Sequence, residues 1–469
     1  MKKALLSALA LAASVAVAAQ DPWLHIYYAP GISYLGLPTD SIASMKLATA
    51  DDPQHVDDVY VTDTSGHSTY INAYEVRKIV HGANVPAISI TTDRPVDEIP
   101  DKENYLDATI TVDGRGAMDD FEGRMQIRGR GNSTWKYKKK PYRVKFDKKT
   151  SMLGFKKMKN YVLLANYIDP SQMRNVLAMK VAQLVGCDFV NTMVPVDLTL
   201  NGKYRGSYLV TEKVGINSSS VDVEETQSIL WELDKNYDET YRFKSPIYQL
   251  PVMVKDPDMD CDPNVAPQTM FEKWKADFIE FERQVDAGNL DAVCDIEGLA
   301  KYLYVFTFTM NHEPRWPKSV YLWKTIDPAA TEPAKYHFGP VWDFDWCYGY
   351  IDGKTVDFES ASTYMFNSPK DPGQKLFGRM LQDKKLIEAI RRVHDDFMAN
   401  HLAEFWQFFD EYAAQIEPSA SANYQKWNIY AQQPFSKHAA LLRQWIEQRL
   451  AFIDKDKNLG LINLGRRYS

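Results

Sequence analysis

The sequence predicts an α+β protein, with strands concentrated in the first half and long helices in the second. Short apolar runs separated by Gly, Asp and Pro turns fill most of the chain before residue 250. Amphipathic helical patterns dominate residues 267–310 and again from residue 374 to about 454. The formal net charge of -7 argues against a generic nucleic-acid binder, so no nucleic-acid partner is expected.

The first residues have the pattern of a secretory signal peptide. Lys2 and Lys3 precede a short apolar run, and Ala16-Val17-Ala18 supplies small residues for cleavage. We expect residues 1–19 to be removed and the mature protein to be secreted, periplasmic or at the cell surface. No later stretch stays apolar for the ~20 residues that a transmembrane helix needs, so no transmembrane segment is expected.

Residues 20–84 predict a small β-rich module, with strands at 24–28, 59–61 and 68–71. A larger α+β domain follows at residues 85–460 and begins with strands at 87–92 and 108–112. A strand at 160–165 precedes a helix that we expect to start at Asp169-Pro170-Ser171 and to end at Gly186. Apolar runs on either side of Asn201-Gly202 predict a β-hairpin.

A glycine-rich turn joins the strands predicted at 125–128 and 142–146. It runs Arg128-Gly129-Arg130-Gly131-Asn132-Ser133-Thr134 and lies within a basic stretch from Arg124 to Lys159. Two glycines allow close approach of a ligand, and the nearby N–H groups and cations can hold phosphate oxygens. The alternative is an ordinary hairpin, because the turn matches neither the P-loop nor the Rossmann pattern.

Asp343 and Asp345 form the pattern that points most directly to chemistry. They follow a strand predicted at 336–342, and on an extended segment side chains two residues apart point the same way. Carboxylate oxygens are the ligands that magnesium prefers. The alternative is a half-buried acidic pair held by arginines, because structural ion pairs also gather carboxylates.

Four cysteines are present, and no pair has the spacing of a zinc site. Cys261 and Cys294 lie in acidic, loop-like contexts and are the best candidates for a disulfide. Cys187 and Cys347 lie among apolar residues, which predicts buried thiols.

Several motifs together resemble the CotH kinase family, which is named for a spore-coat protein kinase. In chain order they are the glycine-rich turn with Trp135, the segment 139–146, Leu164-Ala165-Asn166-Tyr167, Met173-Arg174-Asn175, the hairpin from Leu200 to Lys213, and Gly339-Pro340-Val341-Trp342-Asp343-Phe344-Asp345-Trp346. The resemblance implies an atypical protein-kinase-like fold, with an N-lobe at about 85–215 and a C-lobe at about 216–460. It also implies ATP with Mg²⁺ or Mn²⁺, and a surface or coat protein as substrate.

The resemblance assigns roles to particular residues. Arg128, Arg130, Asn132 and Ser133 would lie near the phosphates, Lys140 or Lys145 would contact phosphate oxygens, Glu212 would lie near the adenine, and Asp343 and Asp345 would hold the metal. The family usually has an Asn-x-Asp turn whose aspartate is a candidate catalytic base, whereas this chain has Asn311-His312-Glu313. The extra methylene carries the carboxylate about 1.5 Å further, roughly one C–C bond.

Three functions remain open at this point. The first is an exported kinase that transfers the γ-phosphate of ATP to a protein hydroxyl, with Asn311 and Glu313 as catalytic residues. The second is a binding or surface protein that keeps the fold with impaired catalysis, since a misplacement near 1 Å can cost about a hundredfold in rate. The third is a carbohydrate hydrolase that uses Glu313 with Asp343 or Asp345 as its carboxylate pair.

Overall fold

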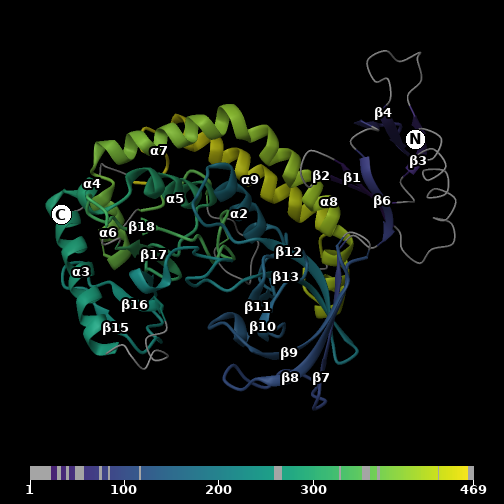
Figure 1. Cartoon of the computed structure of the whole chain (residues 1–469). Coiled ribbons are helices and arrows are strands. Elements are labelled where there is room, and N and C mark those ends of the chain that lie inside the picture. Colours follow the sequence, from purple (N-terminus) through teal and green to yellow (C-terminus); the bar gives the residue numbers. More distant parts are fainter. Residues whose placement is uncertain are drawn as a thin grey trace. The chain divides into compact units, whose positions relative to one another are not determined.

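The structure is a computed structural model (Figure 1), and its residues divide into two compact units. The described residues are 23–28, 33–38, 42–47, 58–72, 76–82, 85–115, 118–257, 267–326, 329–350, 360–366, 370–430 and 432–462. The first unit comprises residues 1–165, 194–210 and 407–436, and the second comprises 166–193, 211–406 and 437–469. The predicted signal peptide lies outside the described residues.

The N-terminal strands form two small antiparallel sheets. One has the order β2-β1-β6, with β1 (Trp23–Tyr28), β2 (Ser33–Pro38) and β6 (Val76–Gly82). The other has the order β3-β4-β5, with β3 (Ile42–Leu47), β4 (Asp58–Asp63) and β5 (Ser68–Asn72). The three strands predicted for this module are therefore present.

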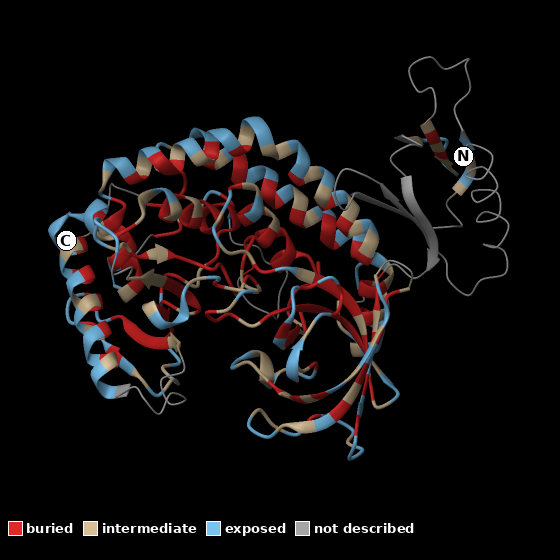
Figure 2. Ribbon diagram, in the orientation of Figure 1, coloured by how far each residue is buried: buried red, intermediate tan, exposed pale blue. Residues whose placement is uncertain are grey.

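A closed barrel forms the main body of the first unit. Its strand order is β10-β11-β13-β12-β7-β8-β9. The strands are β7 (Ala87–Thr92), β8 (Leu106–Asp113), β9 (Phe121–Gly129), β10 (Tyr142–Thr150), β11 (Met158–Leu164), β12 (Met193–Leu200) and β13 (Lys203–Glu212). β12 pairs in parallel with β7, and closure leaves no exposed sheet edge in the barrel. Buried and exposed residues alternate along several of these strands (Figure 2).

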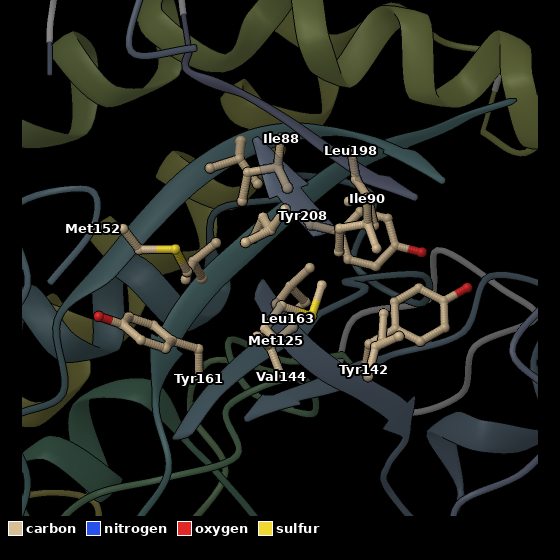
Figure 3. Packing of buried hydrophobic residues seen from close by; sticks show 14 of the residues in the cluster. Ile88, Ile90, Met125, Tyr142, Val144, Met152, Tyr161, Leu163, Leu198 and Tyr208 are labelled. Atoms are coloured by element: carbon tan, nitrogen blue, oxygen red, sulfur yellow. The ribbon is translucent and has the colours of Figure 1, made fainter. Parts of the chain in front are cut away.

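The interior of the barrel is filled by apolar side chains from all seven strands. Figure 3 shows Ile88, Ile90, Val144, Leu163 and Leu198 among the side chains that gather there. Each of these five residues is at most 1% exposed, so the barrel is a packed core rather than an open channel. The sequence alternation that predicted these strands places their apolar residues in this core.

Part of a long helix, α8 (Leu402–Trp427), packs on the barrel within the first unit. Trp427 Nε1 donates a hydrogen bond to the carbonyl of Arg205 at 2.9 Å, and Ser419 Oγ donates to Asp197 at 3.1 Å. The backbone of Gly206 approaches this helix closely, because a Cβ atom added there would lie 2.3 Å from Asn423 Oδ1.

The second unit combines a five-stranded sheet with helices. The sheet has the order β15-β16-β14-β17-β18, with β14 (Ser228–Leu233), β15 (Arg242–Lys244), β16 (Pro251–Asp256), β17 (Val320–Thr325) and β18 (His337–Phe338). The helices are α2 (Arg174–Leu184), α3 (Pro267–Ala287), α4 (Leu290–Val293), α5 (Ile296–Thr309), α6 (Pro372–Met380), α7 (Lys384–Asp396) and most of α9 (Phe435–Lys455). A π-helical segment (Phe397–His401) separates α7 from α8.

Two local predictions were wrong. The helix expected from Asp169 begins at Arg174, because the Asp169 carboxylate accepts hydrogen bonds from the main-chain N–H groups of Ser171 and Arg174 and closes a turn ahead of the helix. Cys294 is a free and fully buried thiol, so the proposed disulfide with Cys261 is not formed. Cys261 itself lies outside the described residues. Cys347 is a buried free thiol as expected, whereas Cys187 is only half-buried.

Replacing Gly206 by alanine tests the packing of α8 on the barrel. Gly206 has φ +97° and lacks room for a side chain, whereas Gly202 has φ +73° and no atom within 4 Å of the place a Cβ would take. We expect Gly202→Ala to cost roughly 1–2 kcal/mol from backbone strain. Gly206→Ala should cost about 1–3 kcal/mol more, because the helix must shift. Urea unfolding measures both, and equal losses would contradict the close packing.

Candidate functional site

The loop after α5 carries two residues predicted to be catalytic, Asn311 and Glu313. The helix ends at Thr309, and the next residue, Met310, has φ +51° and so turns the chain sharply. Asn311 is fully buried, and its Oδ1 accepts a hydrogen bond from the Glu313 N–H at 2.9 Å. Its Nδ2 donates to the main-chain carbonyl of Asp343 at 2.9 Å. The Asn311 side chain therefore fixes the loop and the acidic turn relative to each other.

The segment that carries Asp343 and Asp345 is a turn. Asp343 has φ +64°, so the prediction of an extended segment with both carboxylates on one side was wrong. The strand before it, β18, ends at Phe338, ahead of Gly339-Pro340. Asn175 holds the turn from α2, because its Oδ1 accepts from the Phe344 N–H at 2.9 Å and its Nδ2 donates to Asp345 Oδ1 at 2.5 Å.

A buried ion pair supports the same turn. Arg174 and Asp169 are both at most 1% exposed, and the guanidinium pairs with the carboxylate. Arg174 Nε also donates to the carbonyl of Cys347 at 3.1 Å. Consecutive residues Arg174 and Asn175 therefore hold the two ends of the acidic turn.

Lys318 links the loop to the turn through charge. Its Nζ lies 3.1 Å from Glu313 Oε1 and 3.4 Å from Asp343 Oδ2. The Asp343 and Glu313 carboxylates raise the pKa of Lys318, which stays charged. Burial and the Asp343 charge raise the pKa of Glu313 to about 8, and the same two causes raise the pKa of Asp345 to about 7. Glu313 and Asp345 therefore hold their protons to a higher pH than exposed carboxyl groups do.

These residues fit a divalent cation by their donor chemistry. The available ligands are carboxylate oxygens from Asp343 and Asp345, which suit Mg²⁺ or Mn²⁺. Glu313 Oε2 is buried without a hydrogen-bond partner, an unusual state for a carboxylate oxygen that points to an absent partner. A cation bound here would favour the ionised forms of Glu313 and Asp345, whose pKa values burial and the Asp343 charge raise.

The cations predicted to bind phosphate lie in the first unit, around the glycine-rich turn. Arg128 and Lys145 both lie over the ring of Tyr105, at 4.9 Å and 5.7 Å from its centroid. Arg143 is opposite Arg128 on the neighbouring strand. Burial, with Arg128 and Arg130 nearby, lowers the pKa of Arg143. Cations gathered in this way favour an anionic ligand.

The other residues of this turn differ in exposure. Asn132 and Ser133 are exposed, and Gly131 has φ +84°. Lys140 Nζ donates to the carbonyl of Trp135 at 2.6 Å and lies 5.1 Å from the centroid of that ring. Its ammonium group is thus held at the turn.

Lys139, for which no role was predicted, is fully buried. It donates to the carbonyl of Ser207 and lies over the ring of Tyr208. Burial places the pKa of Lys139 well below its ordinary value. The only sequence feature that could have indicated a special role for Lys139 is the second lysine and the proline that follow it.

Glu212, predicted to lie near an adenine, is in the second unit and is 5% exposed. Asn191 Nδ2 donates to its carboxylate at 3.2 Å, and burial raises the pKa of Glu212.

The structure thus brings Asn311, Glu313, Asp343 and Asp345 together within the second unit, and Arg128, Arg130 and Lys145 near one another within the first.

A different group has the spacing of three metal ligands within the described part of the chain. It consists of Asp188, Asp295 and His337, whose ligand atoms lie within 4.8 Å of one another. Asp295 caps α5 by accepting from the Gly298 N–H at 3.1 Å, and His337 is stacked on Trp323. The helix cap and the ring stacking account structurally for Asp295 and His337.

The comparison with protein families decides the classification. The family model described as CotH kinase protein matches residues 127–453. The chain belongs to the CotH kinase family. No curated protein matches the sequence. Among helices within the described residues, none has both the length and the apolarity needed to cross a membrane. Family membership supports a kinase-like function in general, and the particular roles of the predicted residues stay predictions.

Lys318 and Asp234 are the site residues that the sequence did not indicate. Lys318 follows Pro317 in the loop that carries Glu313. This position in the loop is the only sequence feature that could have indicated Lys318 as a site residue. Asp234 Oδ2 accepts from the Ser319 N–H at 3.1 Å, and burial raises the pKa of Asp234 to about 6. Its contact spans 85 residues, so no local pattern predicts it.

Asn175→Ala tests whether Asn175 holds the acidic turn. The variant loses hydrogen bonds to Phe344 and Asp345, so the free energy of unfolding should fall by about 1–3 kcal/mol. Asn400→Ala is the control, because Asn400 makes an exposed hydrogen bond to Asp396 at 2.7 Å. That change should stay within about 0.5 kcal/mol. Guanidinium unfolding compares the two, and equal effects would contradict the role of Asn175.

Proposed function

We propose that this CotH-family protein transfers the γ-phosphate of ATP to a hydroxyl group of a protein substrate, with Mg²⁺ or Mn²⁺. The observation that supports it most strongly is the acidic turn joined to the Asn311–Lys318 loop. Asn311 holds Glu313 and Asp343 in one arrangement through its amide, with both hydrogen bonds at 2.9 Å. Phosphoryl transfer depends on such positioning and on neutralising charge more than on covalent chemistry.

The acidic side chains and the lysine described above each have a role in the proposed transfer. Asp343 and Asp345 would hold the cation, and the chemistry that it would supply is positive charge for the phosphate oxygens. Glu313 accepts the proton of the acceptor hydroxyl while the oxygen of that hydroxyl forms a bond to the γ-phosphorus. The bond from the γ-phosphorus to the bridging oxygen breaks, and ADP leaves. Lys318, between Glu313 and Asp343, keeps the two carboxylates from repelling each other and offers its ammonium group to the transferring phosphoryl group.

For the first unit taken by itself, we propose that the cations beside the glycine-rich turn hold phosphate oxygens. Arg128, Arg130 and Lys145 lie at or beside the glycine-rich turn, and Arg128 Nε is buried without a hydrogen-bond partner. A phosphate oxygen is the kind of acceptor that would satisfy this donor. Secretion or placement at the cell surface belongs to the proposal as well, and it rests on the sequence pattern of residues 1–19.

A second candidate is a protein that keeps nucleotide binding and has impaired transfer. Two observations favour it. Glutamate stands at position 313 where the family usually has aspartate, and Glu313 and Asp343 already share Lys318 as an ion-pair partner. The carbohydrate-hydrolase alternative gives no role to the cations of the glycine-rich turn. Sugar release from glycan substrates tests that alternative directly.

Asp343→Asn tests the metal role of the acidic turn. The variant loses a charged ligand oxygen, so we expect the rise in melting temperature given by Mg-ATP to the wild type to be lost. The change leaves the main-chain carbonyl that Asn311 binds in place. Asp188→Asn is the matched control, because Asp188 belongs to the other candidate metal group, and it should keep the full shift. An equal shift in wild type and Asp343→Asn would contradict the assignment.

Glu313→Gln and Glu313→Asp together test the base. A base acts on the acceptor hydroxyl, so Glu313→Gln should abolish transfer from γ-labelled ATP while ATP binding, measured by calorimetry, stays nearly unchanged. Glu313→Asp restores the usual family residue and should keep or raise the rate. If the wild type is inactive and Glu313→Asp gains activity, the impaired-transfer candidate is correct. Absence of ATP binding in the wild type would contradict both candidates.

A further inference from the structure

The hairpin formed by β10 and β11 carries an unusual concentration of positive charge. Residues 136–159 contain ten lysines and one arginine against a single acidic residue, Asp147, in a chain whose formal net charge is -7. Five of these lysines lie at the far end of the hairpin and are exposed. They are Lys148, Lys149, Lys156, Lys157 and Lys159, here called the hairpin lysines.

The local structure holds the hairpin lysines outward. Met152, Leu153, Phe155 and Met158 lie between them, and each is at most 5% exposed within the barrel core. Ser151 Oγ donates to the Phe155 carbonyl at 2.7 Å, and the Phe155 N–H donates to the Met152 carbonyl at 3.1 Å. The loop is therefore an ordered turn anchored by apolar side chains. Binding of a partner would cost little conformational entropy of this loop, because the loop is already ordered.

Most of the hairpin lysines have no acidic partner among the described residues. No ion pair involves Lys148, Lys149, Lys157 or Lys159 in the part of the chain that the structure describes. Elsewhere exposed lysines do pair, as Lys385 does with Asp291 at 2.9 Å. Like charges held close together repel one another, and an anionic partner would relieve that repulsion.

We propose that the hairpin lysines bind an acidic segment of a partner protein. An exposed aromatic ring, which would favour a single-stranded nucleic acid, does not occur among the described residues of the hairpin. Its apolar side chains are buried, whereas a surface that enters a membrane interface exposes them. A carboxylate-rich polypeptide needs only an array of exposed cations. This binding goes beyond the proposed function and does not require phosphotransfer.

Two matched variants of the full chain test the proposal. In one, the five hairpin lysines are replaced by glutamine. In the other, five exposed lysines from outside the hairpin are replaced in the same way, which gives the same net charge. These are Lys273, Lys384, Lys426, Lys437 and Lys457. Fluorescein-labelled poly-L-glutamate is the probe, and anisotropy measures its affinity at about 0.15 M ionic strength. In two further arms, the same proteins are tested for binding to phosphatidylglycerol vesicles and to a single-stranded oligonucleotide.

We expect the hairpin variant to bind poly-L-glutamate roughly tenfold more weakly than the wild type. The control variant should stay within about twofold of the wild type, because its lysines are dispersed. Equal losses in the two variants, or no loss in the hairpin variant, would overturn the proposal. So would tighter binding of the vesicles or the oligonucleotide through the same five lysines. Because no arm contains ATP, these outcomes are independent of the phosphotransferase proposal.

Discussion

The buried amide of Asn311 joins the two segments that carry the acidic side chains of the second unit. One of its atoms accepts from the Glu313 N–H and the other donates to the Asp343 carbonyl. Neither main-chain group has a regular partner in a helix or sheet, so losing the amide would leave both unsatisfied away from water. The positions of Glu313 and Asp343, the two ion-pair partners of Lys318, depend on this one side chain. Asn175 performs the equivalent task from α2 for the turn that ends at Asp345.

Holding these carboxylates together has an electrostatic cost. Burial and repulsion from Asp343 raise the pKa values of Glu313 and Asp345, and Lys318 and, for Asp345, the Asn175 hydrogen bond oppose the rise. A fold selected for stability alone would place neutral or apolar groups here. The arrangement is therefore better explained by a ligand than by packing. The first unit presents the opposite charge, in cations beside the glycine-rich turn.

The sequence predicted most regular elements because their patterns are local. Alternating apolar residues located the barrel strands, and Asn201-Gly202 located the hairpin of β12 and β13. The predictions that were wrong depended on tertiary contacts or on single backbone angles. Asp343 adopts φ +64° because Asn175 and Asn311 hold its neighbours, and nothing within the segment Val341–Trp346 indicates that constraint. Closure of the barrel and the position of Lys318 likewise arise from residues far apart in the sequence.

We propose that the acidic turn binds a divalent cation together with a nucleotide. Anomalous diffraction from crystals grown with Mn²⁺ and a non-hydrolysable ATP analogue tests it most directly. The account predicts an anomalous peak at ligand distance, about 2.0–2.3 Å, from carboxylate oxygens of Asp343 and Asp345. It also predicts phosphate density against the same ion. A manganese peak confined to Asp188, Asp295 and His337, or nucleotide bound without metal at the acidic turn, would contradict the account.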